Sequence, residues 1–171
     1  SLLILDKEPC KPFDAKRNGL NLGEGAAYVC LQRSEDANAS KILGYIGGYG
    51  NRCDAFHQTA TSPDGEGAFL AMKDALEMSG LSISDINYVN AHGTGTPDND
   101  QSESKALIRL FGNNLPPISS TKSFTGHTTS ASGSIETVIS LLAIENGFIP
   151  ANLRYVNKDV NCIEPSLGTD N

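Results

Sequence analysis

The chain has 171 residues, of which 39% are apolar, and a formal net charge of -7. This length allows one domain with a hydrophobic core and is too short for two ordinary domains. The negative charge argues against nonspecific binding to nucleic acids or acidic membranes, because a polyanion would be repelled. No apolar run approaches the roughly 18 residues of a membrane-spanning helix, so we expect no membrane contact.

Four cysteines are spread along the sequence without a CxxC pair: Cys10, Cys30, Cys53 and Cys162. Their spacing argues against a zinc site and against a disulfide framework, and it fits a reducing, cytoplasmic environment. The sequence starts at Ser1 with neither a methionine nor the basic segment of a signal peptide, so we expect a piece of a longer chain.

The first predicted elements lie in residues 23–80. Two short runs of β-type residues, 23–31 and 42–45, are separated by a polar, turn-rich segment, which predicts a pair of strands. Residues 66–79 carry apolar side chains at helical spacing and are followed by Gly80, a residue that commonly ends helices. We therefore expect a helix over residues 66–79.

A strand, a loop and a helix are predicted next. Residues 87–90 are typical of a short buried strand, and a turn rich in glycine and threonine follows it. Asp98 or Asn99 is expected to cap a helix that carries an apolar face through Phe111 and ends at Gly112.

The same order of elements is predicted a second time. Residues 118–121 form an expected strand after two prolines, and residues 128–146 show the one-face apolar pattern of a helix that ends at Gly147. Two successive units of this kind imply a parallel sheet with right-handed crossovers. The loops that follow the two strands should therefore lie at the same edge of the sheet.

Two histidines occupy these loops, in the sequences NAHGTGTP and STKSFTGH. A single histidine in such a loop is more often structural, but His92 and His127 in matched contexts, with Lys122 before the second, indicate a shared site. Amides at a helix start near His127 and the charge of Lys122 should lower the pKa of an imidazole. Uncharged imidazoles donate to an oxygen that becomes negative, so we expect an oxyanion or enolate site, not a metal site.

Other polar residues near the histidines have two interpretations each. Thr94 and Thr96 could bond a substrate chain or simply close the turn. Glu136 lies on an apolar helical pattern, where an unpaired carboxylate would be costly to bury. It should therefore face solvent or pair with Lys122, a bound cation or backbone amides.

The two histidine motifs, together with CKPFDAKRNGLNLGEGAAYV near the start, resemble the C-terminal half of β-ketoacyl-(acyl carrier protein) synthases, the condensing enzymes of fatty-acid and polyketide synthesis. The resemblance covers almost the whole chain. It implies a thiolase-like α/β fold of βαβα units, with a mixed, mainly parallel sheet flanked by helices, incomplete here relative to the full family fold. Within one unit, residues 1–65 would be the end of the N-terminal half with linking strands, and residues 66–171 the C-terminal half with both histidine motifs.

The resemblance also implies roles for the residues of the two loops. His92 and His127 would bind the carbonyl of a malonyl thioester, so that loss of carbon dioxide leaves a stabilised enolate. Lys122 would order the site, and Thr94 and Thr96 would bond the pantetheine arm of the substrate.

Further positions are matched outside the loops. No cofactor is required, although Asn90 and Glu136 resemble a structural site for a monovalent or divalent cation in some family members. The basic cluster of Lys11, Lys16 and Arg17 is most simply a solvated surface loop. By the resemblance, Lys11 would contribute to docking of the acidic acyl carrier protein.

The sequence also departs from the family. A nucleophilic cysteine needs the start of a helix or a similar setting to become reactive, and none of the four cysteines here is predicted to have one. A glycine-rich FGFGG-like segment, expected shortly beyond Asn171, is missing too. We expect a fragment of a 3-oxoacyl-(acyl carrier protein) synthase, an acyltransferase, that is inactive on its own.

Three functional hypotheses remain. The parent protein would be a cytoplasmic condensing enzyme, a homodimer without nucleic-acid partners, that elongates acyl chains by decarboxylative Claisen condensation on acyl carrier protein. It could instead be a noncatalytic partner subunit similar to the chain-length factors of polyketide synthases, which the residue at the upstream nucleophile position would reveal. A thiolase is the third hypothesis, although its usual motifs do not match these.

Overall fold

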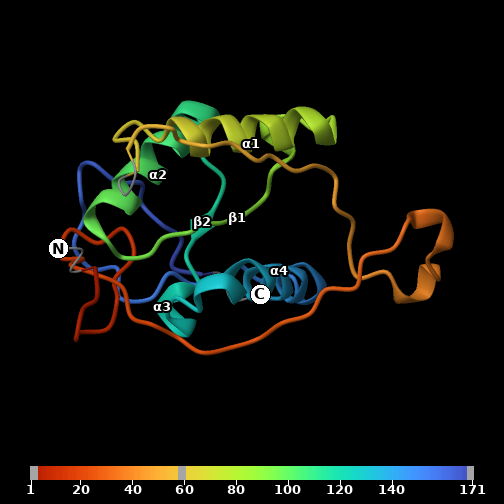
Figure 1. Cartoon of the computed structure of the whole chain (residues 1–171), viewed down its shortest axis with the longest axis horizontal. Helices are drawn as coiled ribbons and strands as arrows, with labels where there is room; N and C mark the ends of the chain where they lie inside the picture. Colours follow the sequence, from red (N-terminus) through yellow and green to blue (C-terminus); the bar gives the residue numbers. More distant parts are fainter. Residues whose placement is uncertain (1–3, 58–60, 169–171) are drawn as a thin grey trace.

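The computed structural model describes residues 4–57 and 61–168 of the chain. Two short strands, β1 (Val89–Asn90) and β2 (Ile118–Ser119), lie between two layers of helices, as Figure 1 shows. The first layer is made of α1 (Glu66–Ser79) and α2 (Pro97–Phe111), and the second of α3 (Lys122–Thr125) and α4 (Ser132–Asn146). The architecture is therefore a partial α/β unit with a small parallel sheet.

The sheet confirms the predicted strand order. β1 and β2 are parallel, with Val89 opposite Ile118 and Asn90 opposite Ser119. The amide of Ala91 donates to the carbonyl of Ser119 at 2.9 Å, so pairing continues just past β1. Both strands are shorter than predicted, but their carboxyl ends lie at the same edge. The two histidine loops consequently begin side by side.

The helix ends follow the glycines of the sequence. α1 has the predicted bounds and ends at Gly80, whose φ of 69° is the left-handed conformation that glycine adopts without a steric cost. α2 ends at Gly112 and α4 ends at Gly147, as predicted. The predicted cap of α2 at Asp98 or Asn99 is wrong, because Thr96 is the N-cap and proline 97, with its fixed φ, starts the helix.

The predicted helix over residues 128–146 begins later than expected. A 3-10 turn, Thr129–Ala131, precedes α4, and the separate short helix α3 lies before it. Thr129 has a φ of 52°, which the interior of a right-handed helix does not allow. The small hydroxyl residues in this segment are also weak helix formers. The chain therefore folds around His127 before the regular helix starts.

The predicted strand pair at residues 23–31 and 42–45 is wrong. Both segments are extended, but the described residues show no ladder between them, and two 3-10 turns, Ser34–Asp36 and Ala39–Lys41, separate them. Figure 1 shows this stretch running out from the helices and back. Side chains such as Tyr28 are exposed. The residue types in these segments favour an extended backbone, but a β-strand also needs a neighbouring strand to which it can hydrogen-bond.

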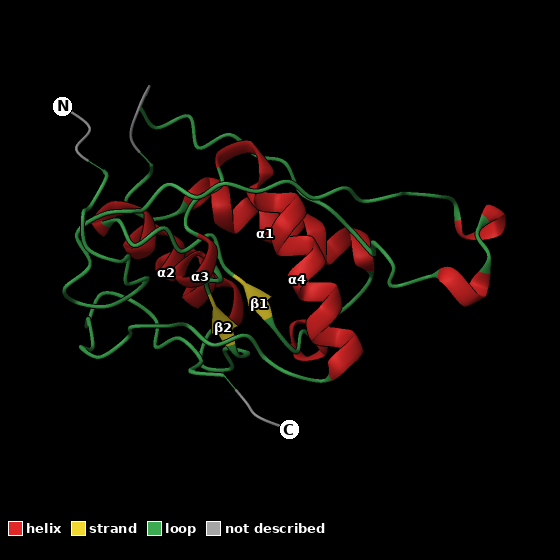
Figure 2. Cartoon of the chain, turned by 90° about the horizontal axis from the view of Figure 1, so that it is seen from below, coloured by secondary structure: helices red, strands yellow, loops and turns green. Residues whose placement is uncertain are grey.

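The core lies between the strands and α2. Figure 2, turned by 90°, shows the strands with the helices around them. The buried apolar residues that pack together come from the loops, the sheet and α2: Phe13, Ala91, Leu107, Phe111, Ile118, Cys162 and Ile163. This packing fixes the carboxyl ends of the strands, and with them the two loops.

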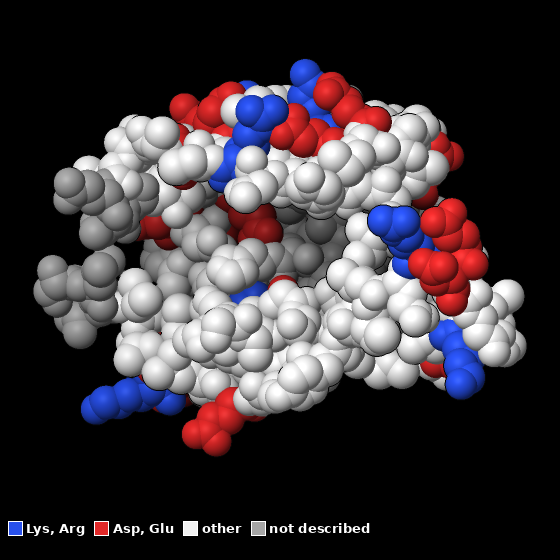
Figure 3. All heavy atoms as spheres, turned by 45° about the vertical axis from the view of Figure 1, so that its right-hand side comes forward, with Lys and Arg blue, Asp and Glu red and all other residues white. Residues whose placement is uncertain are grey.

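Charged side chains gather over α1 and α2. Figure 3 shows acidic and basic residues mixed along the top of the molecule, where these helices lie, above a largely uncharged surface. The ion pairs there include Arg52 with Asp74 and Arg109 with Glu66, and both are partly exposed. Exposed pairs stabilise a fold little. No helix among the described residues has the length and apolar character that crossing a lipid bilayer requires.

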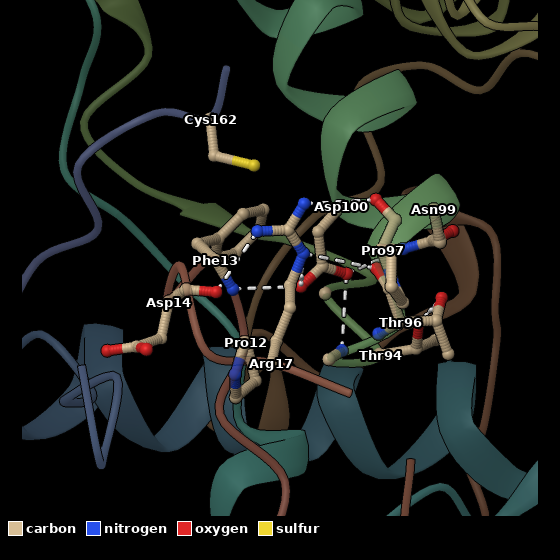
Figure 4. A network of polar contacts seen from close by, with 12 residues as sticks. Pro12, Phe13, Asp14, Arg17, Thr94, Thr96, Pro97, Asn99, Asp100 and Cys162 are labelled. Atoms are coloured by element: carbon tan, nitrogen blue, oxygen red, sulfur yellow. Dashed lines mark hydrogen bonds and ion pairs between the residues drawn. The ribbon is translucent and has the colours of Figure 1, made fainter. Parts of the chain in front are cut away.

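A buried carboxylate fixes the base of the first histidine loop. Asp100, in the first turn of α2, is 0% exposed and accepts hydrogen bonds from the amides of Phe13 at 2.8 Å and Gly95 at 3.2 Å and from the side chain of Asn99 at 3.1 Å. Figure 4 shows these contacts, which we call the Asp100 network, together with the adjacent side chain of Arg17. The network joins the segment before Arg17 to the loop that follows His92.

Arg17 does not belong to an exposed basic cluster. Its guanidinium, with only 6% of the side chain exposed, donates to the carbonyl oxygens of Thr96 and Pro97 and pairs with Asp159. The interpretation of residues 11–17 as a solvated loop is therefore wrong for Arg17, because carboxylates and carbonyls farther along the chain enclose its charge. Lys16 is exposed and Lys11 is partly exposed.

Loss of the Asp100 carboxylate should destabilise the fold. In Asp100→Asn, an NH2 group replaces one acceptor oxygen and faces a buried N–H, so we expect the free energy of unfolding to fall by about 2–4 kcal/mol. Urea unfolding measures this. The matched control is Asp98→Asn, an exposed carboxylate in the same helical turn, which should cost less than about 1 kcal/mol. Equal losses in the two variants would contradict the assignment.

Candidate active site

His92 is held through its backbone. The amides of His92 and Gly93 donate to the two carboxylate oxygens of Glu103 at 2.7 and 2.8 Å. The hydroxyl of Ser120, just after β2, donates to the carbonyl of Gly93 at 2.7 Å. A Cβ at Gly93 would lie 2.4 Å from the Cβ of Ser120, so this close approach requires glycine. The two loops are thus bonded to each other as well as adjacent.

His127 is held on both sides of its backbone. Its amide donates to the carbonyl of Asn21 at 2.8 Å, and its carbonyl accepts from the amide of Gly23 at 3.1 Å. The ring nitrogen Nδ1 accepts a hydrogen bond from the amide of Thr129 at 3.1 Å. A nitrogen that accepts an N–H carries no proton, so the proton of the neutral ring is on Nε2. His127 therefore has one donor nitrogen available to a ligand.

The structure brings the two histidines together. Their ring centroids are 5.1 Å apart and the ring planes are nearly perpendicular, at 85°. The residue His92 is exposed, yet desolvation by the surrounding protein is the largest cause that lowers its pKa to about 4, followed by the charges of Lys122 and His127. Desolvation and then Lys122 also lower the pKa of His127. Near pH 7 both imidazoles are consequently uncharged, as the sequence predicts.

Lys122 and Glu136 form a buried ion pair. The ammonium of Lys122, on α3 and 2% exposed, contacts a carboxylate oxygen of Glu136 on α4. Of the alternatives considered for Glu136, the pairing with Lys122 is the one observed. The pair satisfies a charge that would otherwise be costly to bury, and it places a positive charge near both imidazoles.

Glu103 is a site residue that the sequence analysis missed. It lies eleven residues after His92, within a polar run of α2 that reads as a solvated helical surface. Burial raises the pKa of its carboxyl to about 7, although the hydrogen bonds from the amides of Gly93 and His92 lower it. Only the fold brings this side chain back under the histidine loop, so no local sequence signal could have identified it.

The two threonines close the turn after His92. Thr94 and Thr96 are buried, and their hydroxyls lie 2.9 Å apart. The amide of Thr96 also donates to the hydroxyl of Thr94 at 3.4 Å. The structure therefore shows the turn-closing contacts, while contact with a substrate chain stays a prediction.

Two of the four cysteines are buried and two are exposed. Cys10 is buried, its Sγ donates to the carbonyl of Lys122 at 3.2 Å, and burial raises its pKa. Burial raises the pKa of Cys162 to about 11. Cys30 and Cys53 are exposed and lie in extended or irregular segments. The two buried thiols are therefore not activated, and the absence of the nucleophile from this chain stays a prediction.

Asn90 and Glu136 line one pocket, as a shared cation site would require. The side-chain oxygen of Asn90 accepts from Thr121 at 3.5 Å, its buried NH2 group has no partner, and Glu136 is paired with Lys122. Hard cations take about six oxygen ligands. Two partly engaged side chains do not complete such a site within residues 4–57 and 61–168.

Both the sequence and the fold of this chain are similar to those of known proteins. The model of the Beta-ketoacyl synthase C-terminal domain matches residues 43–156, and that of the N-terminal domain matches residues 2–37. The chain is 44% identical to 3-oxoacyl-[acyl-carrier-protein] synthase 2 of Synechocystis sp. over 156 residues, which cover 89% of this chain and 38% of that protein. The chain thus spans about two fifths of the length of this curated relative.

Two solved structures are similar to the fold. The ishigamide ketosynthase/chain length factor has a TM-score of 0.90 and 34% identity, covering 97% of this chain and 42% of that one. A type II polyketide synthase acyl-carrier protein in complex with its ketosynthase has a TM-score of 0.85 and 31% identity, covering 94% and 41%. These ketosynthases have the thiolase-like α/β fold, so the predicted fold class is confirmed.

Removal of the buried ion pair tests how charge controls the two rings. In the double variant Lys122→Met/Glu136→Gln, we expect the pKa of His92 to rise, because the ammonium that opposes its protonation is gone and no unpaired carboxylate remains. It should stay below the ordinary value, since burial is the larger cause. NMR titration of protein with ¹⁵N-labelled histidine measures it.

The matched control is Lys105→Met, which removes an exposed lysine that pairs with Asp64. This control should leave the pKa of His92 unchanged. An unchanged pKa in the folded double variant as well would show that Lys122 does not influence the ring.

Proposed function

This chain belongs to the β-ketoacyl synthase family, and we propose that the protein containing it is a 3-oxoacyl-(acyl carrier protein) synthase. It would elongate acyl chains by decarboxylative Claisen condensation of a malonyl group carried by acyl carrier protein. The observation that carries the proposal is the pair of uncharged imidazoles, His92 and His127, with ring centroids 5.1 Å apart. Two neutral N–H donors at this separation suit one oxygen that gains negative charge.

The proposed reaction follows from these donors. The N–H groups of His92 and His127 bind the carbonyl oxygen of the malonyl thioester. The bond between the carboxylate carbon and the α-carbon breaks, carbon dioxide leaves, and the electron pair becomes an enolate whose oxygen is held by the imidazoles. The α-carbon then attacks the carbonyl of an acyl thioester on the nucleophile, forms the new carbon–carbon bond and expels the thiolate.

Lys122 would support this reaction without touching the substrate. Its ammonium opposes protonation of both imidazoles, and a protonated pair would hold two like charges about 5 Å apart. Pairing with Glu136 keeps the ammonium in place. Thr94 and Thr96 would bond the pantetheine arm at the entrance of the site, in addition to closing the turn.

The nucleophile would come from the remainder of the protein. The chain spans about two fifths of its curated relative, and burial raises the pKa of the Cys10 and Cys162 thiols, which disfavours the thiolate there. The 171 residues alone would therefore carry out neither acyl transfer nor condensation.

Acyl carrier protein is the proposed partner, in a cytoplasmic homodimer of the parent protein. A related ketosynthase has been solved with its acyl-carrier protein, at 31% identity to this chain. Lys11 is partly exposed on the loop before Arg17 and would contribute one positive charge to docking. The rest of a basic surface would lie outside this acidic segment.

A noncatalytic role similar to that of a chain length factor is the second candidate. It is favoured by the similarity to the ishigamide ketosynthase/chain length factor, with a TM-score of 0.90. The residue at the nucleophile position of the parent protein distinguishes the two. Cysteine there supports the condensing enzyme, and any residue without a thiol supports the partner subunit.

Replacement of His127 should abolish decarboxylation. In His127→Ala of the parent protein, we expect the release of carbon dioxide from malonyl-acyl carrier protein to fall at least about 100-fold, because one of two oxyanion donors is lost. The control His57→Ala removes the histidine outside the pair and should keep the normal rate. Carbon dioxide release that persists in His127→Ala would overturn the proposed role.

Reversal of the charge at Lys11 should weaken docking. In Lys11→Glu of the parent protein, we expect the Kd for acyl carrier protein to rise about tenfold, with a smaller effect at high salt, since repulsion between like charges is screened there. Lys41→Glu, an exposed lysine in the 3-10 turn Ala39–Lys41, serves as the control. Equal affinities of Lys11→Glu and the unmodified protein, measured by calorimetry, would count against this docking position.

A further inference from the structure

The hydroxyl of Ser132 contacts the ring of His127. Ser132 is the first residue of α4, and only 7% of it is exposed. Its Oγ lies 3.1 Å from Nδ1 of His127 and 3.3 Å from the hydroxyl of Thr128. A serine at a helix start ordinarily caps the helix, but α4 has Ala131 at the N-cap and no side-chain cap. The hydroxyl therefore contacts His127 and Thr128 and does not cap the helix.

The direction of this hydrogen bond follows from the other contact of the ring. The amide of Thr129 donates to the same Nδ1 at 3.1 Å, so that nitrogen is an acceptor. Ser132 must then be the donor in its contact with Nδ1. Its oxygen can accept from the hydroxyl of Thr128, which gives a chain of donors from Thr128 through Ser132 to His127. Hydrogen bonds that run in one direction polarise one another.

The backbone before α4 is strained in the way that this contact requires. Thr129 is a β-branched residue at a φ of 52°, where such residues are rare. This conformation accompanies the turn of its amide toward Nδ1. Strained backbone persists where the surrounding structure determines it, and it is concentrated at functional sites. Two groups of the segment 128–132, the amide of Thr129 and the hydroxyl of Ser132, thus contact the same nitrogen of the ring.

We propose that Ser132 is a positioning residue for His127, whose hydroxyl, as the second donor to Nδ1, keeps the ring proton on Nε2. Protonation of Nδ1 would break the hydrogen bond from the amide of Thr129 and would require the hydroxyl of Ser132 to change from donor to acceptor, so the present arrangement opposes formation of the imidazolium. The consequence for catalysis rests on the proposed function, in which the Nε2 proton binds the thioester oxygen. The position of the proton itself does not depend on that function.

Ser132→Ala in the parent protein tests the proposal. Loss of one donor should raise the pKa of His127 by about 0.5–1 pH unit and populate the Nδ1–H tautomer, both visible in ¹⁵N NMR of labelled histidine. Malonyl decarboxylation should fall about 3–10-fold. The control Ser130→Ala changes an exposed serine of the same turn and should move neither quantity.

A second pair of variants separates the hydroxyl from packing. Ser132→Thr and Ser132→Val have the same shape, and only the threonine keeps a hydroxyl. We expect His127 to keep its tautomer and its pKa in the threonine variant. In the valine variant we expect a higher pKa and a population of the Nδ1–H tautomer. This comparison replaces Ser132→Ala if that variant does not fold.

The outcomes separate the inference from the proposed function. An unchanged tautomer and pKa of His127 in Ser132→Ala, or equal values in the threonine and valine variants, would overturn the role of Ser132. A changed tautomer with normal decarboxylation would support the role of Ser132 and count against the proposed role of His127.

Discussion

The site depends on keeping two adjacent imidazoles uncharged. At a centroid separation of 5.1 Å, two imidazolium rings would repel each other in surroundings that solvate charge poorly. Desolvation and the ammonium of Lys122 both lower the pKa values of the rings and so oppose that state, and the ammonium is balanced by Glu136 and adds no unpaired charge. The resulting neutral N–H groups can stabilise a negative oxygen without releasing a proton to it. This electrostatic condition links the buried ion pair to the proposed chemistry.

The backbone of each histidine is held by groups distant in the sequence. Glu103 binds the amides at His92, and the strand-like segment around Asn21 binds both backbone groups of His127. The Asp100 network fixes the turn that follows His92. Short parallel strands could not by themselves orient two rings. Hydrogen bonds to the loops supply that orientation, which is why polar residues of α2 are buried in a chain of modest apolar content.

Local signals in the sequence predicted much of the fold. Glycines at the helix ends adopt special backbone conformations, so the ends at Gly80, Gly112 and Gly147 could be read from the sequence. The order of strand, loop and helix also predicted that His92 and His127 would lie together. Features that depend on distant partners were not predictable in this way. The extended segments 23–31 and 42–45 do not pair, and the acceptor for His92 is on the following helix. The charge of Arg17 was expected to be exposed, but it is buried in a pair with Asp159. Asp159 lies far along the chain, so no residue near Arg17 in the sequence indicates this pairing.

The proposed chemistry requires that both imidazoles are neutral donors near pH 7. A ¹⁵N NMR titration of the unmodified parent protein with labelled histidine tests it most directly, since it reports the charge and tautomer of each ring. We expect His92 to stay neutral from pH 8 down to about pH 5 and to gain a proton only near its pKa of about 4, and we expect His127 to be neutral near pH 7 and to titrate below the ordinary histidine value. An imidazolium at either position above pH 6.5 would contradict it.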